Sequence, residues 1–281
     1  MVLPPANGAF IHPFGIGEFQ MKIKLVILAV MATLGFGLAI AAPSQAQATR
    51  TWVSGVGDDA NPCSRTAPCK TFQGAIAKTA AQGEINCIDP GGFGGVTITK
   101  SITISCVGVE AGVLVSGTNG IIVNMPAASD VAILQGLDIE GLGTGLSGVK
   151  MLGNGTVTIR NTIIHHFLDA GVTVQGVAGA KANIIDSYIS NNGNPATPSG
   201  GGVNVAGGAN ANSATVYGSV IDSNVSYAIQ VDTNQSATVG SSKLVGSGPK
   251  LVINNTGTIT SYGNNIIRGA TATPTTTSPL M

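Results

Sequence analysis

The chain has 281 residues, of which only 9% are charged, and its 13 basic residues balance its 13 acidic ones. Because no run of either sign occurs, the composition excludes a surface that attracts nucleic acid or an anionic membrane by charge. The 40 glycines and the low aromatic content of 4% are typical of a protein with many tight β-turns.

Residues 1–48 are predicted to be an N-terminal extension followed by a secretory signal peptide, with Met21 as the natural start. The signal consists of the two lysines of MKIK, an apolar run and an A-x-A cleavage site, at Met21–Lys24, Leu25–Ala42 and Ala46–Ala48. The alternative is an uncleaved membrane anchor. Cleavage before Thr49 would leave no transmembrane segment and would place the protein outside the cytoplasm, as a secreted, periplasmic or cell-surface protein.

Residues 49–83 are predicted to form an N-terminal strand, a loop that contains two cysteines, and a capping helix. The strand covers Thr51–Ser54, and the helix extends from the N-cap Thr71 to about Ala81. Four residues of the helix share one face, namely Phe72, Ala75, Ile76 and Thr79. This helix is expected to cover the open end of the repeat that follows.

Residues 84–270 are predicted to be a β-solenoid, because apolar residues recur at intervals of about two dozen residues. The runs are short and rich in Val, Ile and Thr with period-two alternation, which favours strands over helices. One core position recurs at Ile139, Ile164, Ile189, Ile221, Leu244 and Ile267. Residues 271–281, TATPTTTSPLM, are predicted to be a disordered tail.

The segment TWVSGVGDDANPCSRTAPCKTFQGAIAKTAAQGEINCIDPGGF and the repeats after it, about residues 51–270, resemble a known family. They are similar to the bacterial right-handed parallel β-helix repeat proteins with a pectin-lyase-like fold. The resemblance implies an all-β, right-handed parallel β-helix of roughly eight coils with an N-terminal capping helix. It does not imply one function, since this fold carries lyases, hydrolases, epimerases, adhesins and inert scaffolds.

The four cysteines of an exported chain suggest disulfides. INCI and ISCV are the same pattern one short coil apart, so Cys87 and Cys106 should occupy equivalent places in adjacent coils. Stacked strands lie ~4.8 Å apart, within bridging range. The remaining pair, Cys63 and Cys69, would close a small loop. Metal binding by the cysteines is the competing interpretation, and the lack of nearby histidines weighs against it.

One row that faces outward carries ionisable groups, at Glu140, His165, Ser190 and Asp222. A carboxylate beside an imidazole is a candidate acid/base pair, so Glu140, His165 and Asp222 are the catalytic residues if the protein is an enzyme. The alternative is a surface ion pair. Because the row faces outward, replacing Ser190 by Asp is expected to be tolerated.

The outward rows of the first strand in each coil hold no carboxylate, and one of them is expected to run from Ile133 to Ser261. This departs from the acidic clusters of the pectate lyases and polygalacturonases that the fold resembles. Candidate ligand-binding residues here are Arg160, Asn183, Tyr188 and Tyr217, which offer hydrogen bonds and aromatic rings to a sugar. The alternative role of the tyrosines is simply to form strands.

The sequence therefore indicates an exported, non-catalytic surface or envelope protein, with polysaccharide binding along an outward strand face as its candidate activity. The alternative is a polysaccharide lyase or glycoside hydrolase of the same fold with an atypical site. No cofactor and no metal site are predicted.

Overall fold

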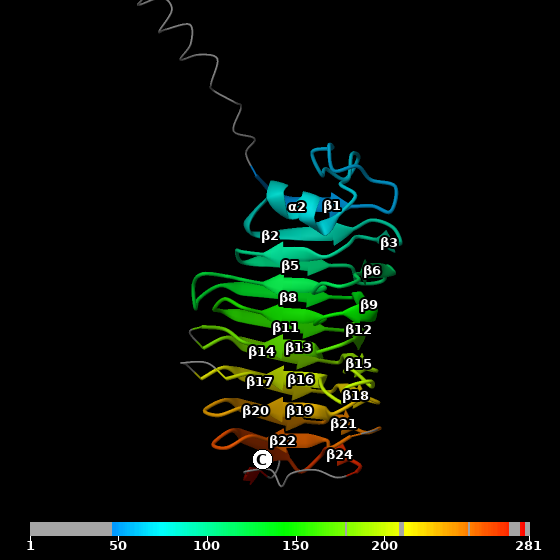
Figure 1. The fold of residues 1–281 in the computed structure, drawn as a ribbon. Coiled ribbons are helices and arrows are strands. Elements are labelled where there is room, and N and C mark those ends of the chain that lie inside the picture. The colour runs from blue at the N-terminus through cyan, green and yellow to red at the C-terminus, as the bar shows by residue number, and fades with distance from the viewer. Residues whose placement is uncertain (1–46, 178, 208–210, 247, 270–275, 279–281) are drawn as a thin grey trace, which may run out of the picture. The chain divides into compact units, whose positions relative to one another are not determined.

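The computed structural model describes residues 47–177, 179–207, 211–246, 248–269 and 276–278. In these ranges the chain winds through three parallel β-sheets of ten, eight and seven strands. Figure 1 shows the strands of successive coils stacked one above another. The predicted all-β parallel β-helix is thereby confirmed. Residues 1–46 of the predicted extension and signal peptide lie outside the described residues, and Ala48, the last residue of that prediction, begins the first strand.

Each coil passes through the three sheets in turn. The first sheet consists of β1 (Ala48–Val53), β2 (Thr79–Cys87), β5 (Ile102–Ser105), β8 (Val131–Gln135), β11 (Thr156–Arg160), β14 (Lys181–Ile185), β17 (Ser213–Tyr217), β20 (Ser236–Gly240), β23 (Thr258–Tyr262) and β25 (Thr276–Ser278). The second sheet consists of β3 (Gly91–Gly92), β6 (Ala111–Leu114), β9 (Asp138–Gly145), β12 (Ile163–Phe167), β15 (Tyr188–Ser190), β18 (Val220–Asp222), β21 (Lys243–Leu244) and β24 (Ile266–Ile267). The third sheet consists of β4 (Val96–Ile98), β7 (Ile121–Val123), β10 (Val149–Met151), β13 (Ala170–Val174), β16 (Gly201–Val205), β19 (Tyr227–Val231) and β22 (Leu251–Ile253).

The core lies between the three sheets and is built from rows of aliphatic side chains, one residue per coil. The predicted core position is correct, because Ile139, Ile164, Ile189, Ile221 and Leu244 are fully buried and aligned, whereas Ile267 in the last coil is only partly buried. Burial of such rows between stacked coils is the main source of stability in a solenoid. The expected outward row is wrong at its end: Ser261 aligns with the core residue Val239 and is buried.

From β8 to β21 the corners between the first and second sheets are two residues long, and their first residue adopts the left-handed conformation. These residues are Gly136, Asn161, Asp186, Gly218 and Ser241. The second residues form a buried ladder, in which the N–H of Ser187 donates to Oγ of Ser219 in the next coil at 3.2 Å. An asparagine ladder follows the second sheet, where Asn192 Nδ2 donates to Asn224 Oδ1 at 3.1 Å. These bonds satisfy polar groups that the tight corners bury.

Helix α2 (Phe72–Lys78) precedes the first complete coil. Its N-cap is Thr71, whose hydroxyl accepts a hydrogen bond from the Gly74 N–H at 2.9 Å. Phe72, Ala75 and Ile76 are buried as predicted. The helix ends earlier than the expected Ala81, because β2 begins at Thr79 and pairs with β1.

Both predicted disulfides are present. Cys63 is bonded to Cys69, and Cys87 to Cys106 with 4.9 Å between the Cα atoms. The pairing of β2 with β5 places Cys87 and Cys106 in adjacent coils, which is the reason for the predicted connectivity. The second disulfide therefore ties the first two coils together.

The C-terminal residues differ from the prediction of a tail without structure, since Thr276–Ser278 forms β25 and pairs with β23. No helix in the described ranges is long and apolar enough to cross a membrane.

Candidate functional site

The predicted row of ionisable residues exists on the second sheet. Strand pairing aligns Glu140 with His165, His165 with Ser190, and Ser190 with Asp222. Asp222 is therefore three coils from Glu140, and its carboxylate accepts a hydrogen bond from the Tyr188 hydroxyl at 3.3 Å. Ser190 is only 3% exposed, so the expectation that Asp would be tolerated there is not supported by its surroundings. The row brings Glu140 and His165 together and leaves Asp222 apart.

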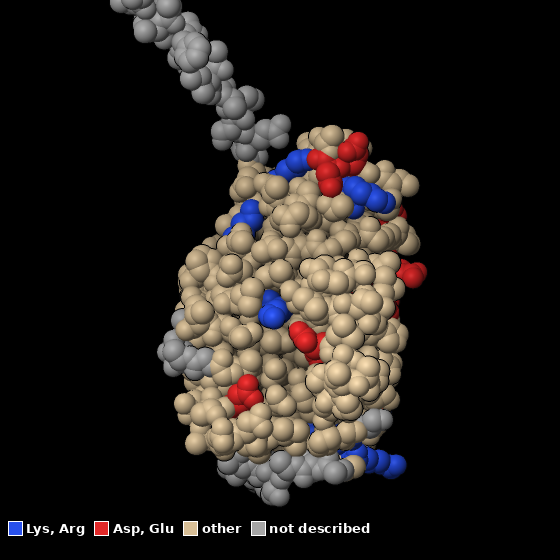
Figure 2. Space-filling view, viewed as in Figure 1, with Lys and Arg blue, Asp and Glu red and all other residues tan. Residues whose placement is uncertain are grey.

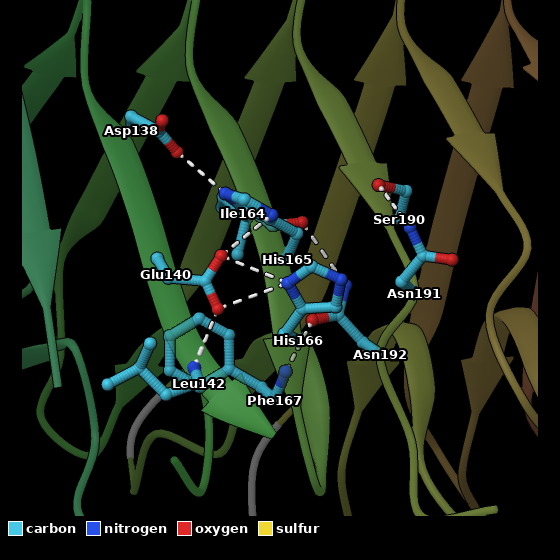
Figure 3. Close-up of polar contacts among 10 residues, drawn as sticks. All are labelled: Asp138, Glu140, Leu142, Ile164, His165, His166, Phe167, Ser190, Asn191 and Asn192. Atoms are coloured by element: carbon cyan, nitrogen blue, oxygen red, sulfur yellow. Dashed lines mark hydrogen bonds and ion pairs between the residues drawn. The ribbon is translucent and has the colours of Figure 1, made fainter. Parts of the chain in front are cut away.

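His165 lies between two carboxylates. Its Nε2 is 2.7 Å from Asp138 Oδ1, and its Nδ1 is 3.0 Å from Glu140 Oε2. The same Glu140 oxygen is 2.9 Å from Nδ1 of His166. Figure 3 shows the Glu140 carboxylate directed at both imidazoles, with Asp138 on the far side of His165. We call Asp138, Glu140, His165 and His166 the histidine cluster.

His166 takes part because of the backbone at the end of β12. In a regular strand it would point to the face opposite His165, into the core. The pairing of β9 with β12 is irregular between His165 and Phe167, and His166 has a φ of 59°. Asn191 and Ser223 adopt the same left-handed conformation in the following coils. The bulge keeps the His166 side chain outward, where it is 48% exposed.

The carboxylate of Glu140 is held as an anion. Partial burial by itself raises the pKa of Glu140. The hydrogen bond from His166, the hydrogen bond from the Leu142 N–H at 2.6 Å, and the two imidazoles outweigh that effect and leave the pKa below its ordinary value. Glu140 is therefore a fixed negative charge facing two imidazole nitrogens.

Asp138 is the member of the cluster that the sequence analysis missed. Strand pairing aligns it with Ile163 rather than with His165, so a row-by-row comparison does not place the two side chains in contact. The available signal was the alternation in β9, where Asp138 and Glu140 flank the buried Ile139 and must both face outward. An imidazole between two carboxylates can exchange protons or bind a cation, and as an ion pair it can also simply stabilise the surface.

Three of the four predicted ligand-binding residues lie on the first sheet, and the fourth does not. Asn183 belongs to β14, Arg160 ends β11 and Tyr217 ends β17. Ile185 separates Arg160 from Tyr217 in the same row. Tyr188 belongs to the second sheet, so the two tyrosines do not share one face. The structure therefore does not assemble the four residues into a single site.

Tyr217 has a different aromatic neighbour. Gly240 pairs with it in the next coil, and a Cβ added to Gly240 would lie 3.3 Å from the ring of Tyr217 and 2.9 Å from the ring of Tyr262. Both rings therefore lie beside a glycine that leaves room for them. Tyr217 is exposed, so its ring is available to a ligand.

A groove lies on the outward face of the third sheet, with a volume of about 540 Å³. One row crosses it, with one residue from each of four coils, namely Lys150, Thr173, Asn204 and Gln230. Figure 2, viewed as Figure 1, shows only scattered charged side chains on the face that carries β13, β16 and β19. We call this the third-sheet groove. The sequence analysis did not single out its residues.

The polar groups of the third-sheet groove are not all satisfied. Asn204 Oδ1 and Ser226 Oγ are buried, and among the described residues they have no hydrogen-bond partner. The hydroxyl of Tyr227, another lining residue, has its pKa raised by burial and by the nearby Asp169 and Asp232, so it remains a donor at neutral pH. An unsatisfied buried polar group costs about 1–3 kcal/mol.

Comparisons with known proteins agree with the architecture. The chain is similar to the crystal structure of pectate lyase Pel9A, with a TM-score of 0.60 and 15% identity over 83% of this chain and 79% of that chain. It is also matched to a rhamnogalacturonan lyase, with a TM-score of 0.33 and 10% identity over 77% of this chain and 74% of that chain. No curated protein matches the sequence. Residues 111–275 match the family described as the right handed beta helix region, and this match covers more than half of the 281 residues. The chain therefore belongs to the right-handed β-helix family.

Proposed function

We propose that this protein is exported and binds a polysaccharide in the third-sheet groove without cleaving it. The observation that carries the proposal is the row of polar side chains across the groove, repeated once per coil from β10 to β19. A ligand that is itself a repeating chain of hydroxyl groups matches a surface on which donors and acceptors repeat. Neutral amides and hydroxyls both donate and accept, as sugar hydroxyls require.

The fold supports the choice of ligand class. The name of pectate lyase Pel9A gives pectate as its substrate, so a β-helix of this kind can present a surface to a polysaccharide. At 15% identity the likeness concerns the fold alone. The identity of the sugar therefore has to come from a binding experiment.

The composition of the groove supports binding rather than cleavage. Among the described residues that line it, Asp169 is the single carboxylate. Glycoside hydrolases use two carboxylates at a defined separation, and a calcium site uses several oxygen ligands. The alternative function, a lyase or hydrolase, would use Glu140 and His165, and the contact of His165 with Asp138 is the observation that favours it.

The proposal of export rests on the two disulfides and on the predicted signal. Disulfides persist in oxidising compartments. Mass spectrometry of the exported protein should find Thr49 as the N-terminal residue. A chain recovered from the membrane fraction with Leu25–Ala42 still attached would contradict cleavage.

Binding can be tested with the mature protein on a glycan array, followed by calorimetry with the best ligand. Asn204→Ala and Gln230→Ala should each weaken binding about fivefold or more, since each removes a hydrogen bond to the ligand worth ~1 kcal/mol or more. Thr215→Ala, an exposed position on the outward face of the first sheet, is the matched control and should leave binding unchanged.

The same wild-type and variant proteins decide whether the ligand binds in the third-sheet groove or on the first sheet, and whether the protein binds or cleaves it. Loss of binding in Tyr217→Ala, with binding retained in both groove variants, would move the ligand to the first sheet. New reducing or unsaturated ends that disappear in Glu140→Gln would replace the binding function with the enzymatic one.

A further inference from the structure

We propose that Glu140, His165 and His166 form a binding site for a zinc ion, with Asp138 positioning His165. This site is separate from the third-sheet groove, and the inference does not depend on polysaccharide binding. One ligand atom from each of the three residues can be chosen so that all lie within 4.8 Å of one another. Two imidazoles and one carboxylate are a set of donors that zinc accepts.

Two of the three distances between donor atoms, those from Glu140 to each imidazole, are close to the distances in a tetrahedral site. Zinc bonds to imidazole nitrogen and carboxylate oxygen are ~2.0–2.2 Å long, so two ligand atoms of a tetrahedron lie about 3.3–3.6 Å apart. Glu140 Oε2 is 3.0 Å from Nδ1 of His165 and 2.9 Å from Nδ1 of His166. Separating each pair by a few tenths of an ångström would make room for the ion.

Asp138 selects the tautomer of His165 that can bind a metal ion. Its Oδ1 lies 2.7 Å from Nε2, which is the distance of a strong hydrogen bond from the Nε2–H. In the neutral imidazole this leaves a lone pair on Nδ1, directed at the carboxylate of Glu140. A lone pair and a carboxylate oxygen repel at 3.0 Å unless a proton or a metal ion lies between them. Metal-binding histidines commonly have such a carboxylate behind the ring.

The site is also held in place and open to solvent. The Leu142 N–H donates to Glu140 Oε1 at 2.6 Å and holds the carboxylate with Oε2 facing both imidazoles, while Oε1 also lies 3.1 Å from Nδ1 of His166 (Figure 3). His165 is 21% exposed and His166 is 48% exposed. Three protein ligands and an accessible fourth position are typical of zinc sites that keep a water molecule. Nitrogen donors disfavour calcium and magnesium, which take oxygen ligands.

The next coil supplies conservative replacements for the test. Ser190 aligns with His165, and Asn191 follows it with the same left-handed backbone as His166. His165→Ser and His166→Asn therefore place side chains that the β-helix already accepts at these positions. Asp222→Asn, in the same row but three coils away from Glu140, is the control for loss of a carboxylate.

Zinc content and affinity should be measured on tag-free mature protein, by mass spectrometry of the metal and by calorimetry with Zn²⁺ after treatment with a chelator. We expect wild type and Asp222→Asn to bind one zinc ion per chain, and His165→Ser and His166→Asn to lose it. Asp138→Asn should bind about tenfold to hundredfold more weakly. Circular dichroism should show the same folded spectrum for all variants.

Two results would overturn the site. The first is wild-type protein that binds no zinc above the level of the two histidine variants. The second is zinc binding that a large excess of Ca²⁺ abolishes, because such competition would indicate oxygen ligands elsewhere. Binding of Co²⁺ in place of Zn²⁺, with the strong visible absorption of a four-coordinate site, would support the proposed geometry.

Discussion

Ile189→Ala should be the most informative test of how the coils are held together. Ile189 is fully buried and aligned with Ile164 in one neighbouring coil and Ile221 in the other. A Cβ added to Gly171 would lie only 2.5 Å from Ile189 Cγ2, so the isoleucine already fills the space beside that glycine. The substitution removes three carbon atoms at ~0.8 kcal/mol each and leaves a cavity. We expect a loss of about 3–4 kcal/mol.

The loss can be measured by urea unfolding followed by circular dichroism, with Thr215→Ala as the control. Thr215 is exposed on the outward face of β17, so its truncation should change the free energy of unfolding by about 0.5 kcal/mol or less. Hydrogen exchange in β15 would show whether the loss is local, as in a protein whose coils contact only their neighbours. Equal effects of Ile189→Ala and Thr215→Ala would refute the assignment of inward and outward rows.

Three further predictions follow from other parts of the molecule. Cys87→Ser should speed hydrogen exchange in β2 and β5 before it affects later coils, because the disulfide with Cys106 connects only the first two coils. Loss of a native disulfide typically costs ~2–5 kcal/mol. Partial burial raises the pKa of Asp59, but hydrogen bonds from Thr71 and Lys70 outweigh this effect and leave the pKa below its ordinary value of 3.8. The contribution of Asp59 to stability is therefore complete above pH 3.8 and is lost as the pH falls through the lower pKa of the folded state. Asp59→Asn should remove that part of the acid sensitivity in unfolding curves measured from neutral pH downward. Incubation with pectate, polygalacturonate or alginate should give no cleavage with or without added Ca²⁺, and turnover that vanished in His165→Ser would contradict this.

The repeat period and the alternation of apolar residues determined most of the fold. They are local properties of the sequence, because a strand exposes alternate residues to opposite faces and a coil must stack on its neighbour. From them followed the core row through Ile189, the pairing of Cys87 with Cys106, and the alignment of Glu140 with His165. The error at Ser261 also comes from reasoning by repeat spacing. The spacing between strands in the last coil differs by one residue, and this places Ser261 in the core row rather than in the outward row.

The candidate sites depend on structural features that an alignment of the sequence repeats does not show. Asp138 reaches His165 diagonally from a neighbouring position, and His166 joins the cluster only because the irregular pairing at Phe167 turns it outward. The third-sheet groove arises where the outward row meets the corner that contains Ser226. Side-chain directions at a bulge, and the shape that a corner gives to the face beside it, are set by contacts between coils. Only the tertiary structure decides them, because the sequence period specifies which residues are neighbours and not how closely their side chains approach.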